Sequence, residues 1–292
     1  MKHAYLVIAH NQFELLKELV LLLESQSDND FYIHIDKKAN VEDFTKLLDL
    51  EKYTNIHIIQ KHSVTWGGHS QIECELTLLE AALSSDTEYD YLHIISGVDL
   101  PVKSMEYVND FFEKNKGKEF LYFDVYQDRK NIFSRCKEYH LFQEKLGRKE
   151  EGLLYNIERY FIHLQKKLHV NRVKNIEQYL GKGANWVTIT SGFAEYVVRN
   201  KKIIKKYFWH TRCADEVFMH TLFNMSPYKE NLYIPGEDEG IKYTNMVYTD
   251  WERGNPYILQ DEDIDSLIKS PYLFARKFDN NISIERLKEK IL

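Results

Sequence analysis

The stretch that decides the fold reads AYLVIAH (residues 4–10), FELLKELVLLLES (13–25) and FYIHID (31–36). The first and last segments are apolar runs of strand length, whereas the middle one repeats its apolar residues at helical spacing. Strands that alternate with helices along a chain are typical of a parallel sheet in an α/β fold. The nearly continuous apolar strands agree with this, because helices cover both faces of such a sheet.

The alternation continues through the first hundred residues. The patterns predict a helix over 41–50, a strand over 55–60, a helix over 71–85 and a strand over 89–97. The last of these strands stops at Gly97. We therefore expect a mostly parallel sheet built from this part of the chain.

Residues 125–182 differ in character, because they are rich in Lys, Arg and Glu and mostly helical in pattern. We interpret them as an excursion from the sheet rather than a separate domain. Beyond them, the sequence predicts a strand in NWVTIT (185–190), a helix from Gly192 to Asn200 and another near Asp215. A strand over 242–251 and a terminal helix complete a single domain that spans residues 1–292.

Composition limits the functional classes. The chain has 292 residues and a net charge of −6, and its basic runs are short and scattered, so nucleic acid is not an expected partner. The mean hydropathy is −0.49, and the longest apolar stretch, Leu19–Leu23, is too short to span a bilayer. We expect no signal peptide, because Met1-Lys-His leads directly into the first predicted strand. The cysteines Cys74, Cys136 and Cys213 form neither a metal pattern nor a disulfide framework, which favours a reduced, cytoplasmic, soluble protein.

Polar residues stand where three predicted strands end, namely His10, Asp36 and Asp99. In an open parallel sheet, ligands bind outside the carboxyl ends of the strands. Asp36 can accept a hydrogen bond from a base or ribose there, or it can form an ordinary turn or helix cap. Asp99 projects from a stiff turn, because Pro101 restricts Leu100 to an extended conformation. No Walker A loop and no GxGxxG follows the first strand, which excludes those two nucleotide-binding motifs.

Two motifs combine a tryptophan with glycine. VTWGGHS (64–70) places Trp66 before two glycines, which permit either close backbone approach to a ligand or a plain turn. YTDWERGNP (248–256) presents Trp251 and Arg253 next to a glycine. A tryptophan can stack on the apolar face of a sugar ring or simply pack in the core.

Two other motifs carry charge. CADEVF (213–218) holds adjacent acids at a predicted helix start, where Asp215 or Glu216 is a candidate general base and complementing the helix dipole is the alternative. SPYLFARKFD (270–279) sets the cations Arg276 and Lys277 between two phenylalanines. Fixed cations suit a transferring phosphate group, while a helix cap or a surface salt bridge is the alternative.

Several segments, taken in order, resemble one family. The chain is similar to the core-2/I-branching β-1,6-N-acetylglucosaminyltransferases and the related peptide O-xylosyltransferases, which form glycosyltransferase family 14. The resemblance spans nearly the whole chain and is carried by AYLVIAHNQ, FYIHIDKK, VTWGGHSQIECELTLLEAAL, YDYLHIISGVDLPVKS, GANWVTIT, CADEVFMHTL and LFARKFD. The short chain, without a membrane anchor or the family's many disulfide cysteines, indicates a bacterial member.

The resemblance implies a GT-A-like fold with a nucleotide-binding half (1–124), a helical insertion (125–182) and an acceptor and catalytic half (183–292). It also implies an inverting transfer of a sugar, with GlcNAc or xylose expected, from a UDP-sugar to a hydroxyl of a glycan acceptor. Residues 125–182 have no match in the family, so the resemblance implies nothing about the acceptor.

Individual residues match the family's motifs. Glu216 matches the catalytic base, and Lys277 matches the lysine that binds the diphosphate. The second diphosphate cation is either Arg253 or Arg276, because the spacing upstream does not match cleanly. The resemblance also places His10 and Asp36 near the uridine. It places Trp66, Asp99 and the acceptor-stacking Trp251 near the donor or acceptor sugar.

The family's branching enzymes need no metal, because cationic side chains replace it. The resemblance therefore implies no metal and no other cofactor for this chain. Two acidic triplets match the metal-binding DxD motif in letters but are poorly placed. Asp28-Asn29-Asp30 precedes a predicted strand instead of following one, and Asp261-Glu262-Asp263 stands at a predicted helix start.

The expected partners are a UDP-sugar and a glycan or lipid-linked oligosaccharide, as in the synthesis of surface polysaccharides. The Lys and Arg clusters between 146 and 206 fit peripheral attachment to the inner face of an anionic membrane, with a solvated helix face as the alternative. A catalytically silent protein that binds nucleotide sugars or glycans on the same fold is the alternative function. A nucleotidyltransferase is disfavoured, because no glycine-rich basic loop stands near the N-terminus.

Overall fold

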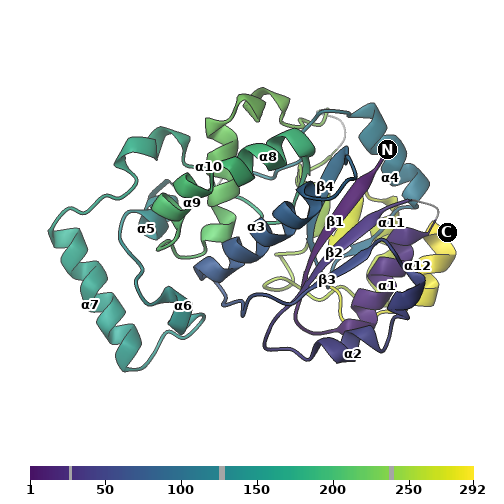
Figure 1. The fold of residues 1–292 in the computed structure, drawn as a ribbon, viewed down its shortest axis with the longest axis horizontal. Helices are drawn as coiled ribbons and strands as arrows, with labels where there is room; N and C mark the ends of the chain where they lie inside the picture. Colours follow the sequence, from purple (N-terminus) through teal and green to yellow (C-terminus); the bar gives the residue numbers. More distant parts are fainter. Residues whose placement is uncertain (26–27, 125–128, 237–239) are drawn as a thin grey trace.

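The central sheet has five strands in the order β3-β2-β1-β4-β6 (Figure 1). The structure, a computed structural model, describes residues 1–25, 28–124, 129–236 and 240–292. The four N-terminal strands run parallel to one another, and β6 pairs antiparallel with β4. The strands are β1 (His3–Ala9), β2 (Asp30–Ile35), β3 (Ile56–Ile59), β4 (Tyr91–Ser96) and β6 (Val187–Thr190). The predicted mostly parallel α/β sheet is therefore confirmed.

Alternate residues of β1 point into two hydrophobic cores, one on each face of the sheet. Tyr5 and Val7 join the core formed with α1, α4 and the C-terminal elements, while Ala4 and Leu6 join the core formed with α3, α8 and α10. The burial of both faces explains why the strands have no polar side. The helices are α1 (Phe13–Glu24), α3 (His69–Leu83), α4 (Met105–Lys114), α8 (Ser191–Arg199) and α10 (Phe218–Met225).

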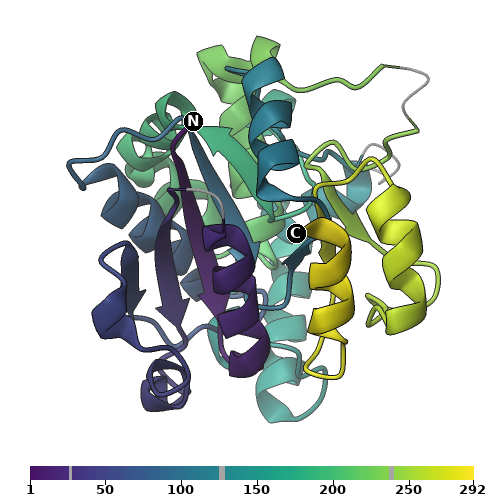
Figure 2. The same cartoon turned by 90° about the vertical axis from the view of Figure 1, so that its right-hand side faces the viewer.

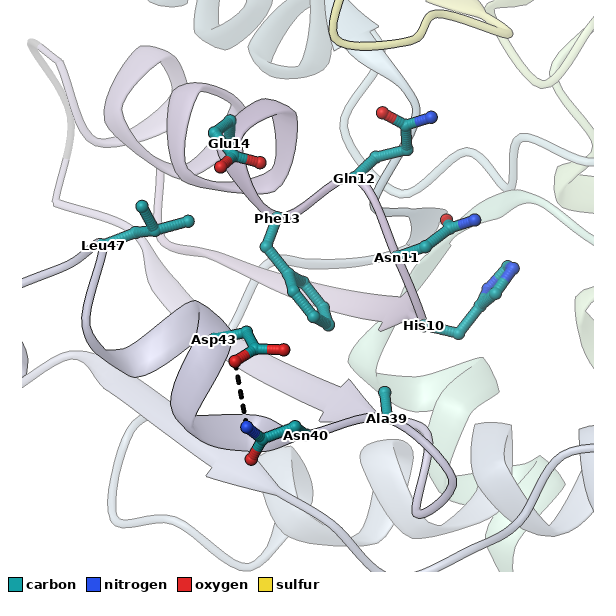
Figure 3. Close-up of a pocket in the computed structure, with 9 residues that line it drawn as sticks. All are labelled: His10, Asn11, Gln12, Phe13, Glu14, Ala39, Asn40, Asp43 and Leu47. Carbon is teal, nitrogen blue, oxygen red and sulfur yellow. Dashed lines mark hydrogen bonds between the residues drawn. The ribbon is translucent and has the colours of Figure 1, made fainter.

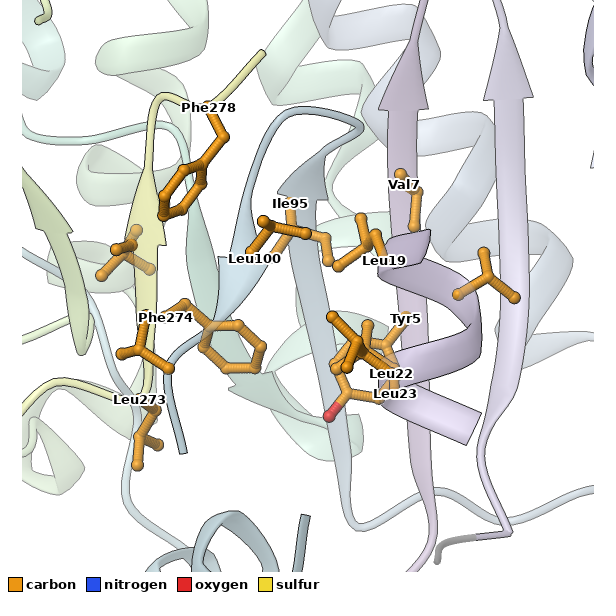
Figure 4. Close-up of a cluster of buried hydrophobic side chains, with 14 of the residues drawn as sticks. Tyr5, Val7, Leu19, Leu22, Leu23, Ile95, Leu100, Leu273, Phe274 and Phe278 are labelled. Carbon is orange, nitrogen blue, oxygen red and sulfur yellow. The ribbon is translucent and has the colours of Figure 1, made fainter. Parts of the chain in front are cut away.

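A second, three-stranded sheet has the order β5-β8-β7. Its members are β5 (Leu100–Pro101), β7 (Val247–Thr249) and β8 (Phe274–Arg276), which lies in the middle. Phe274 and Phe278 are almost fully buried, and both rings point into the same core as Leu100 and Leu19 (Figure 4). The two phenylalanines thus anchor the segment that carries Arg276 and Lys277.

The C-terminal helices α11 (Ile264–Lys269) and α12 (Ile284–Ile291) complete this side of the protein. Helix α12 lies beside α1 in Figure 2, and Lys288 Nζ is 2.9 Å from Glu18 Oε2. The tail of the chain is thereby fixed to the first helix, and β8 is held next to the main sheet.

The segment between α4 and β6 extends away from the sheet, with α7 at the far end of the molecule (Figure 1). It contains helices α5 (Arg129–Cys136), α6 (Gln143–Leu146), α7 (Leu153–Lys167) and η2 (Lys174–Tyr179). The helical character predicted for 125–182 is borne out for the described part of that range. Residues 125–128 lie outside the described residues.

Several predicted elements are shorter than expected. The helix predicted over 41–50 is α2 (Val41–Thr45) followed by η1 (Leu50–Lys52), and the strand predicted over 242–251 is only β7. The helix predicted near Asp215 is first a single 3-10 turn, η3 (Ala214–Glu216), and α10 begins at Phe218. The remaining short elements are α9 (Lys201–Phe208), η4 (Pro227–Asn231) and η6 (Asp261–Asp263).

No helix in the described ranges is both long and apolar enough to cross a membrane. The three cysteines are all buried, and none of them forms a disulfide.

Candidate active site

Asp36 closes the end of β2. Its carboxylate accepts backbone hydrogen bonds from Lys38 N (2.8 Å to Oδ1) and from Val64 N (3.0 Å to Oδ2). The side chain is buried, so these two bonds satisfy a charge that would otherwise be costly to bury. Asp36 therefore joins the end of β2 to the loop that leads to Trp66, in addition to any contact with a ligand.

A cavity of about 500 Å³ opens beside the ends of β1 and β2 (Figure 3). The Phe13 ring points into the space between α1 and α2, and Asn40 Nδ2 donates to Asp43 Oδ1 at 2.9 Å on its floor. The lining residues are His10, Asn11, Gln12, Phe13, Glu14, Ala39, Asn40, Asp43 and Leu47. The cavity combines a ring, amides and an imidazole, which are groups that can stack on and hydrogen-bond to a nucleoside.

His10 connects this cavity to the cations of the C-terminal segment. Its pKa is lowered, first because the ring loses water and further because Lys277, Lys38 and Arg148 are close enough to repel a proton. Asp36 opposes this shift. His10 is therefore neutral near pH 7, and Lys277 is one of the charges that act on it.

Arg276 is held by one ion pair and one aromatic ring. Its Nε donates to Asp99 Oδ1 at 3.0 Å, and its guanidinium lies 4.7 Å from the centre of the Trp186 ring. Asp99 is fully buried and also accepts hydrogen bonds from Ser96 N (2.9 Å) and Ser96 Oγ (2.6 Å). Asp99 was predicted to contact a sugar, but in this structure its carboxylate positions Arg276 and has no exposed surface of its own.

Lys277 and Arg253 differ in how their charges are matched. Lys277 is half-buried, and its ammonium group forms no ion pair with any residue that the structure describes. Arg253 donates from Nε to Asp250 Oδ2 at 2.6 Å and from Nη2 to Asp263 Oδ1 at 2.8 Å. The charge of Arg253 is thus matched by two carboxylates, whereas that of Lys277 is available to an anion.

Trp251 follows β7 and has 54% of its surface exposed. The buried Asp250 accepts hydrogen bonds from the backbone N–H groups of Glu252 (2.9 Å) and Arg253 (3.0 Å), which fixes the turn that carries the indole. An exposed indole on a fixed turn is free to stack on a ligand, and it contributes little to the core.

Glu216 lies between two cations from the helical segment. Its Oε2 accepts a hydrogen bond from Arg135 Nη1 at 2.7 Å and lies 3.4 Å from Lys182 Nζ. The other oxygen, Oε1, has no partner within the described ranges, and a third of the side chain is exposed. The backbone carbonyl of Glu216 also accepts a hydrogen bond from Gly183 N at 3.0 Å. The carboxylate is therefore fixed at one oxygen and open at the other.

The loop at Trp66 supports the turn that carries Glu216. Cys213 N donates to Gly67 O at 2.9 Å, and Gln71 Nε2 donates to Asp215 Oδ2 at 3.1 Å. Gly67 has φ +69°, a conformation that glycine adopts without strain, and a Cβ there would meet Cys213 Sγ at 3.2 Å. Trp66 itself is partly exposed, so the structure brings its indole to the edge of the site.

Asp215 is the buried neighbour of Glu216. Burial raises the pKa of Asp215 to about 7, and the charge of Glu216 adds to the rise. Burial and the charge of Asp215 also raise the pKa of Glu75, which is 1% exposed. Of the two adjacent acids in the motif, only Glu216 is reachable from solvent, while Asp215 belongs to the support beneath it.

Residues 182–186 connect the Glu216 side of the site to the Arg276 side. Lys182 contacts Glu216, and Trp186, four residues later, packs its ring against Arg276. An extended chain spans at most about 3.6 Å per residue, so the Cα atoms of Lys182 and Trp186 are within roughly 15 Å. One short segment therefore contacts both the general-base candidate and Arg276.

Sequence reasoning missed four residues of this region, Arg135, Lys182, Trp186 and Arg148. Arg148 lies with its guanidinium 5.0 Å from the centre of the Trp66 ring. Three of the four come from 125–182, which was interpreted as an excursion from the sheet with no match in the family. One signal was available: Lys182 stands between two glycines just before a predicted strand, an unusual place for a solvated lysine.

Carboxylates of both acidic triplets contact other groups of the protein. Asp28 and Asp30 both lie near Lys2 Nζ, at 2.9 and 3.1 Å, beside the start of β2 and away from Asp36 at its end. Asp263 binds Arg253, and Asp261 accepts a hydrogen bond from Ser283 N at 2.7 Å. Within the described part of the chain, no three His, Cys, Asp or Glu side chains are grouped so that they could hold a metal ion.

The chain is similar to known proteins over most of its length. Residues 3–263 match the family described as Core-2/I-Branching enzyme. The xylosyltransferase oxt of Drosophila pseudoobscura pseudoobscura is 27% identical over 271 residues, which cover 85% of this chain and 28% of that protein. Xylosyltransferase 2 of Rattus norvegicus is 24% identical over 308 residues, which cover 98% of this chain and 33% of that protein. The chain thus spans about a third of the length of these curated relatives.

Among solved structures, an active-site mutant of LgtC aligns with 99% of this chain and 95% of its own, at 10% identity and a TM-score of 0.47.

The family match covers the segments that contain His10, Asp36, Trp66 and Glu216. The family match and the mostly parallel sheet together confirm the predicted GT-A-like fold class and the predicted resemblance. The chain belongs to the core-2/I-branching enzyme family.

Proposed function

We propose that this chain is an inverting glycosyltransferase that moves a sugar from a UDP-sugar to a hydroxyl group of a glycan. The observation that carries the proposal is the Glu216 carboxylate, which is fixed at Oε2 by Arg135 and Lys182 and open at Oε1. A general base needs one oxygen that can reach a proton, and neighbouring groups that hold the carboxylate in position. The available charge of Lys277 supports the same function.

The reaction we propose is a single displacement. Oε1 of Glu216 accepts the proton of the acceptor hydroxyl while the hydroxyl oxygen forms a bond to the anomeric carbon. The bond from that carbon to the β-phosphate oxygen breaks, and its electron pair leaves with UDP. Attack from the face opposite UDP inverts the anomeric centre. Lys277 and Arg276 stabilise the charge that grows on the β-phosphate, a contribution of the kind that is worth about 10²–10³ in rate per donor.

The UDP moiety is proposed to bind at the ends of β1 and β2. The cavity beside Phe13 and Asn40 has the size of a nucleoside site, and His10, which lines it, has its pKa lowered in part by the charge of Lys277. Trp66 and Trp251, both exposed, are proposed to contact the donor and acceptor sugars. Xylose or GlcNAc is the proposed sugar, and the names of the curated relatives support xylose.

We propose that no metal takes part, because the cations of β8 supply the positive charge that the leaving group requires. The measurement is initial-rate UDP release in EDTA, with and without added Mn²⁺. Equal rates support the proposal. Activity that disappears in EDTA and returns with Mn²⁺ overturns this part of it and leaves the assignment of the base unaffected.

The proposed acceptor is a surface glycan, reached from the inside of the cell. The three free cysteines accord with a reducing compartment, because cysteines in oxidising compartments are commonly paired.

The central test is Glu216→Gln. This change keeps the shape of the side chain and its bond to Arg135 but removes the ability to take a proton. We expect UDP affinity to stay within about twofold and turnover to fall at least about 10²-fold. The matched control is Glu195→Gln, which alters an exposed pair with Arg199 and should leave turnover unchanged.

Unchanged turnover in Glu216→Gln contradicts the assignment of the base. If the wild-type chain binds UDP-sugars but releases no UDP with any acceptor tested, the chain is instead a binding protein on the same fold. Binding is measured by thermal shift, because a true donor raises the melting temperature in proportion to RT ln(1 + [L]/Kd).

A further inference from the structure

Helix α7 exposes an apolar stripe that the rest of the protein leaves uncovered. Its members recur every three or four residues, which puts them on one face of the helix. They are Leu153, Ile157, Tyr160, Phe161, Leu164 and Leu168 at the helix end, and all six are exposed. Large side chains that gather on a protruding helix usually mark an interaction site, whereas scattered exposed ones need no explanation.

A different face of α7 packs on the protein. Glu158 is the only buried residue of the helix, and its Oε2 accepts a hydrogen bond from Phe142 N at 3.2 Å. Gln165 is bound on the same side, where its amide exchanges two hydrogen bonds with the backbone of Tyr139 (2.7 and 3.0 Å). Polar contacts therefore fasten the helix to the protein, and the most exposed members of the stripe, Leu153, Tyr160 and Leu168, lie outside this contact. This is the reverse of a normal surface helix.

The surroundings of the stripe are positively charged. Residues 143–174 contain eight Lys or Arg and four Glu, a net charge of +4, whereas the rest of the chain contains 31 Lys or Arg and 41 Asp or Glu, a net charge of −10. Lys167 is three residues beyond Leu164 and therefore lies beside the stripe, with Lys166 next to it on the polar side. A basic, apolar-striped segment on an acidic protein selects an anionic partner.

We infer that α7 docks on the surface of an anionic phospholipid membrane. The apolar stripe enters the boundary between headgroups and acyl chains, while the basic side chains attract the headgroups. With 15 residues the helix is about 22 Å long, too short and too polar to cross a bilayer, so it lies along the surface. Tyr160 and Phe161 are suited to this depth, because aromatic rings favour the interface.

The docking segment is joined to the candidate active site. Arg148, in the loop before α7, stacks on Trp66, and Glu144 in α6 accepts a hydrogen bond from Ser70 N at 3.1 Å. Arg135, which holds Glu216, lies in α5, the helix that precedes α6 in the chain. A membrane-bound α7 therefore keeps the site close to the bilayer. The inference about docking does not depend on the proposed chemistry, since it rests on α7 alone.

A second copy of the chain is the main competing occupant. Two-fold symmetric contacts are the commonest kind, and such a contact through α7 would bring two segments of charge +4 together. Like charges placed opposite each other oppose association, whereas anionic headgroups neutralise them. The charge of the segment therefore favours the membrane over a dimer.

The test is flotation of the full chain with vesicles. We expect it to float with vesicles of equal parts phosphatidylglycerol and phosphatidylcholine and not with phosphatidylcholine alone. Raising the salt from about 0.1 M to 1 M should weaken the binding, because the screening length falls from about 10 Å to 3 Å.

The variant for this test replaces the three most exposed stripe residues. The triple variant carries Leu153→Asp, Tyr160→Asp and Leu168→Asp. The side chains that it replaces are 78%, 66% and 67% exposed, respectively, so the fold should tolerate the changes. We expect binding to anionic vesicles to fall at least tenfold, roughly what losing a single apolar contact costs. The matched control is Ile234→Asp, at an exposed apolar residue (79%) outside α7, which should bind like the wild type.

Two outcomes overturn the inference. The first is a triple variant that floats with anionic vesicles as well as the wild type does, while its melting temperature is unchanged. The second is a wild-type chain that binds neither kind of vesicle, whether it stays monomeric or forms a dimer by sedimentation equilibrium that the triple variant loses. UDP release with a soluble acceptor should be the same in wild type and triple variant, which separates docking from catalysis.

Discussion

Arg276 and Asp99 form a buried ion pair across 177 positions of sequence, with Arg276 Nε 3.0 Å from Asp99 Oδ1. Asp99 has no exposed surface, and only 15% of the Arg276 side chain is exposed. The pair joins the turn after β4 to the end of β8, so it fixes where the cation points. Because Lys277 directly follows Arg276 at the end of β8, the pair also sets the position of the segment that we propose binds the diphosphate.

The first prediction concerns this pair. Asp99→Asn leaves the Arg276 charge without its partner in a buried place, a change that typically costs about 3–5 kcal/mol. We expect the free energy of unfolding, measured by urea denaturation, to fall by that order and UDP affinity, measured by calorimetry, to fall as well. The control is Asp250→Asn, which breaks the pair with Arg253; it should lose stability but keep UDP affinity. Equal UDP affinity in Asp99→Asn and wild type contradicts the positioning role.

The second prediction concerns Lys277. Its ammonium group has no ion-pair partner in the described ranges, so Lys277→Ala should leave the melting temperature within a degree or two, a change of about 0.5 kcal/mol or less. Turnover should fall about 10²–10³-fold if the cation stabilises departing UDP. Steady-state kinetics and thermal unfolding check both parts. Lys202→Ala, at an exposed lysine of α9, serves as the control and should change neither.

Arg253→Ala distinguishes the two candidates for the second cation. Because Asp250 and Asp263 already hold Arg253, we expect this variant to lose stability but to keep its affinity for UDP. Arg276→Ala should weaken UDP binding. If the effects on UDP binding are found the other way round, Arg253 is the second diphosphate cation.

The third prediction concerns Arg135, which holds Glu216 from the helical segment. Arg135→Met removes the 2.7 Å contact and leaves Lys182 alone at Oε2. A base displaced by about 1 Å can lose of the order of 10²-fold in rate, so we expect kcat to fall by about 10- to 10²-fold with UDP affinity unchanged. Arg135→Lys should recover part of the loss. Arg199→Met, in an exposed pair, is the control. A change in UDP affinity equal to that in kcat would point to general misfolding instead.

The fourth prediction concerns pH. Asp215 has its pKa raised from 3.8 to about 7 in the folded protein, first by burial. The folded state therefore holds a proton that the unfolded state has lost, so the stability from this group is complete below pH 4 and disappears as pH rises to about 7. The full effect is on the order of 4 kcal/mol, since one pKa unit is about 1.4 kcal/mol. Above about pH 7 the folded protein has therefore lost this contribution to its free energy of unfolding.

Asp215→Asn tests this, because its amide is neutral at every pH. Between pH 5 and pH 8, the free energy of unfolding should fall less in the variant than in the wild type. Urea denaturation at several pH values gives the comparison. If the free energy of unfolding falls equally with pH in the variant and in the wild type, Asp215 does not titrate in this range, which contradicts the prediction.

The N-terminal half of the fold was predictable from sequence, because its signals are local. Apolar runs such as 4–10 and 31–36 fix strands, and the spacing in 13–25 fixes a helix, without any information from distant residues. The ordered motifs also identified the family, and Glu216 and Lys277 were placed by their positions in those motifs. Whether the sites act as proposed stays a prediction.

Only the tertiary structure decided which charges meet. Arg135 was part of a charged segment with no distinguishing pattern, and only its flanking glycines marked Lys182. Both reach Glu216 because the chain folds back between α4 and β6. Arg253 and Arg276 looked equivalent in sequence, yet one binds two carboxylates and the other binds Asp99 and Trp186. An ion pair depends on distances of a few ångströms between residues far apart in the chain, and sequence spacing does not contain those distances.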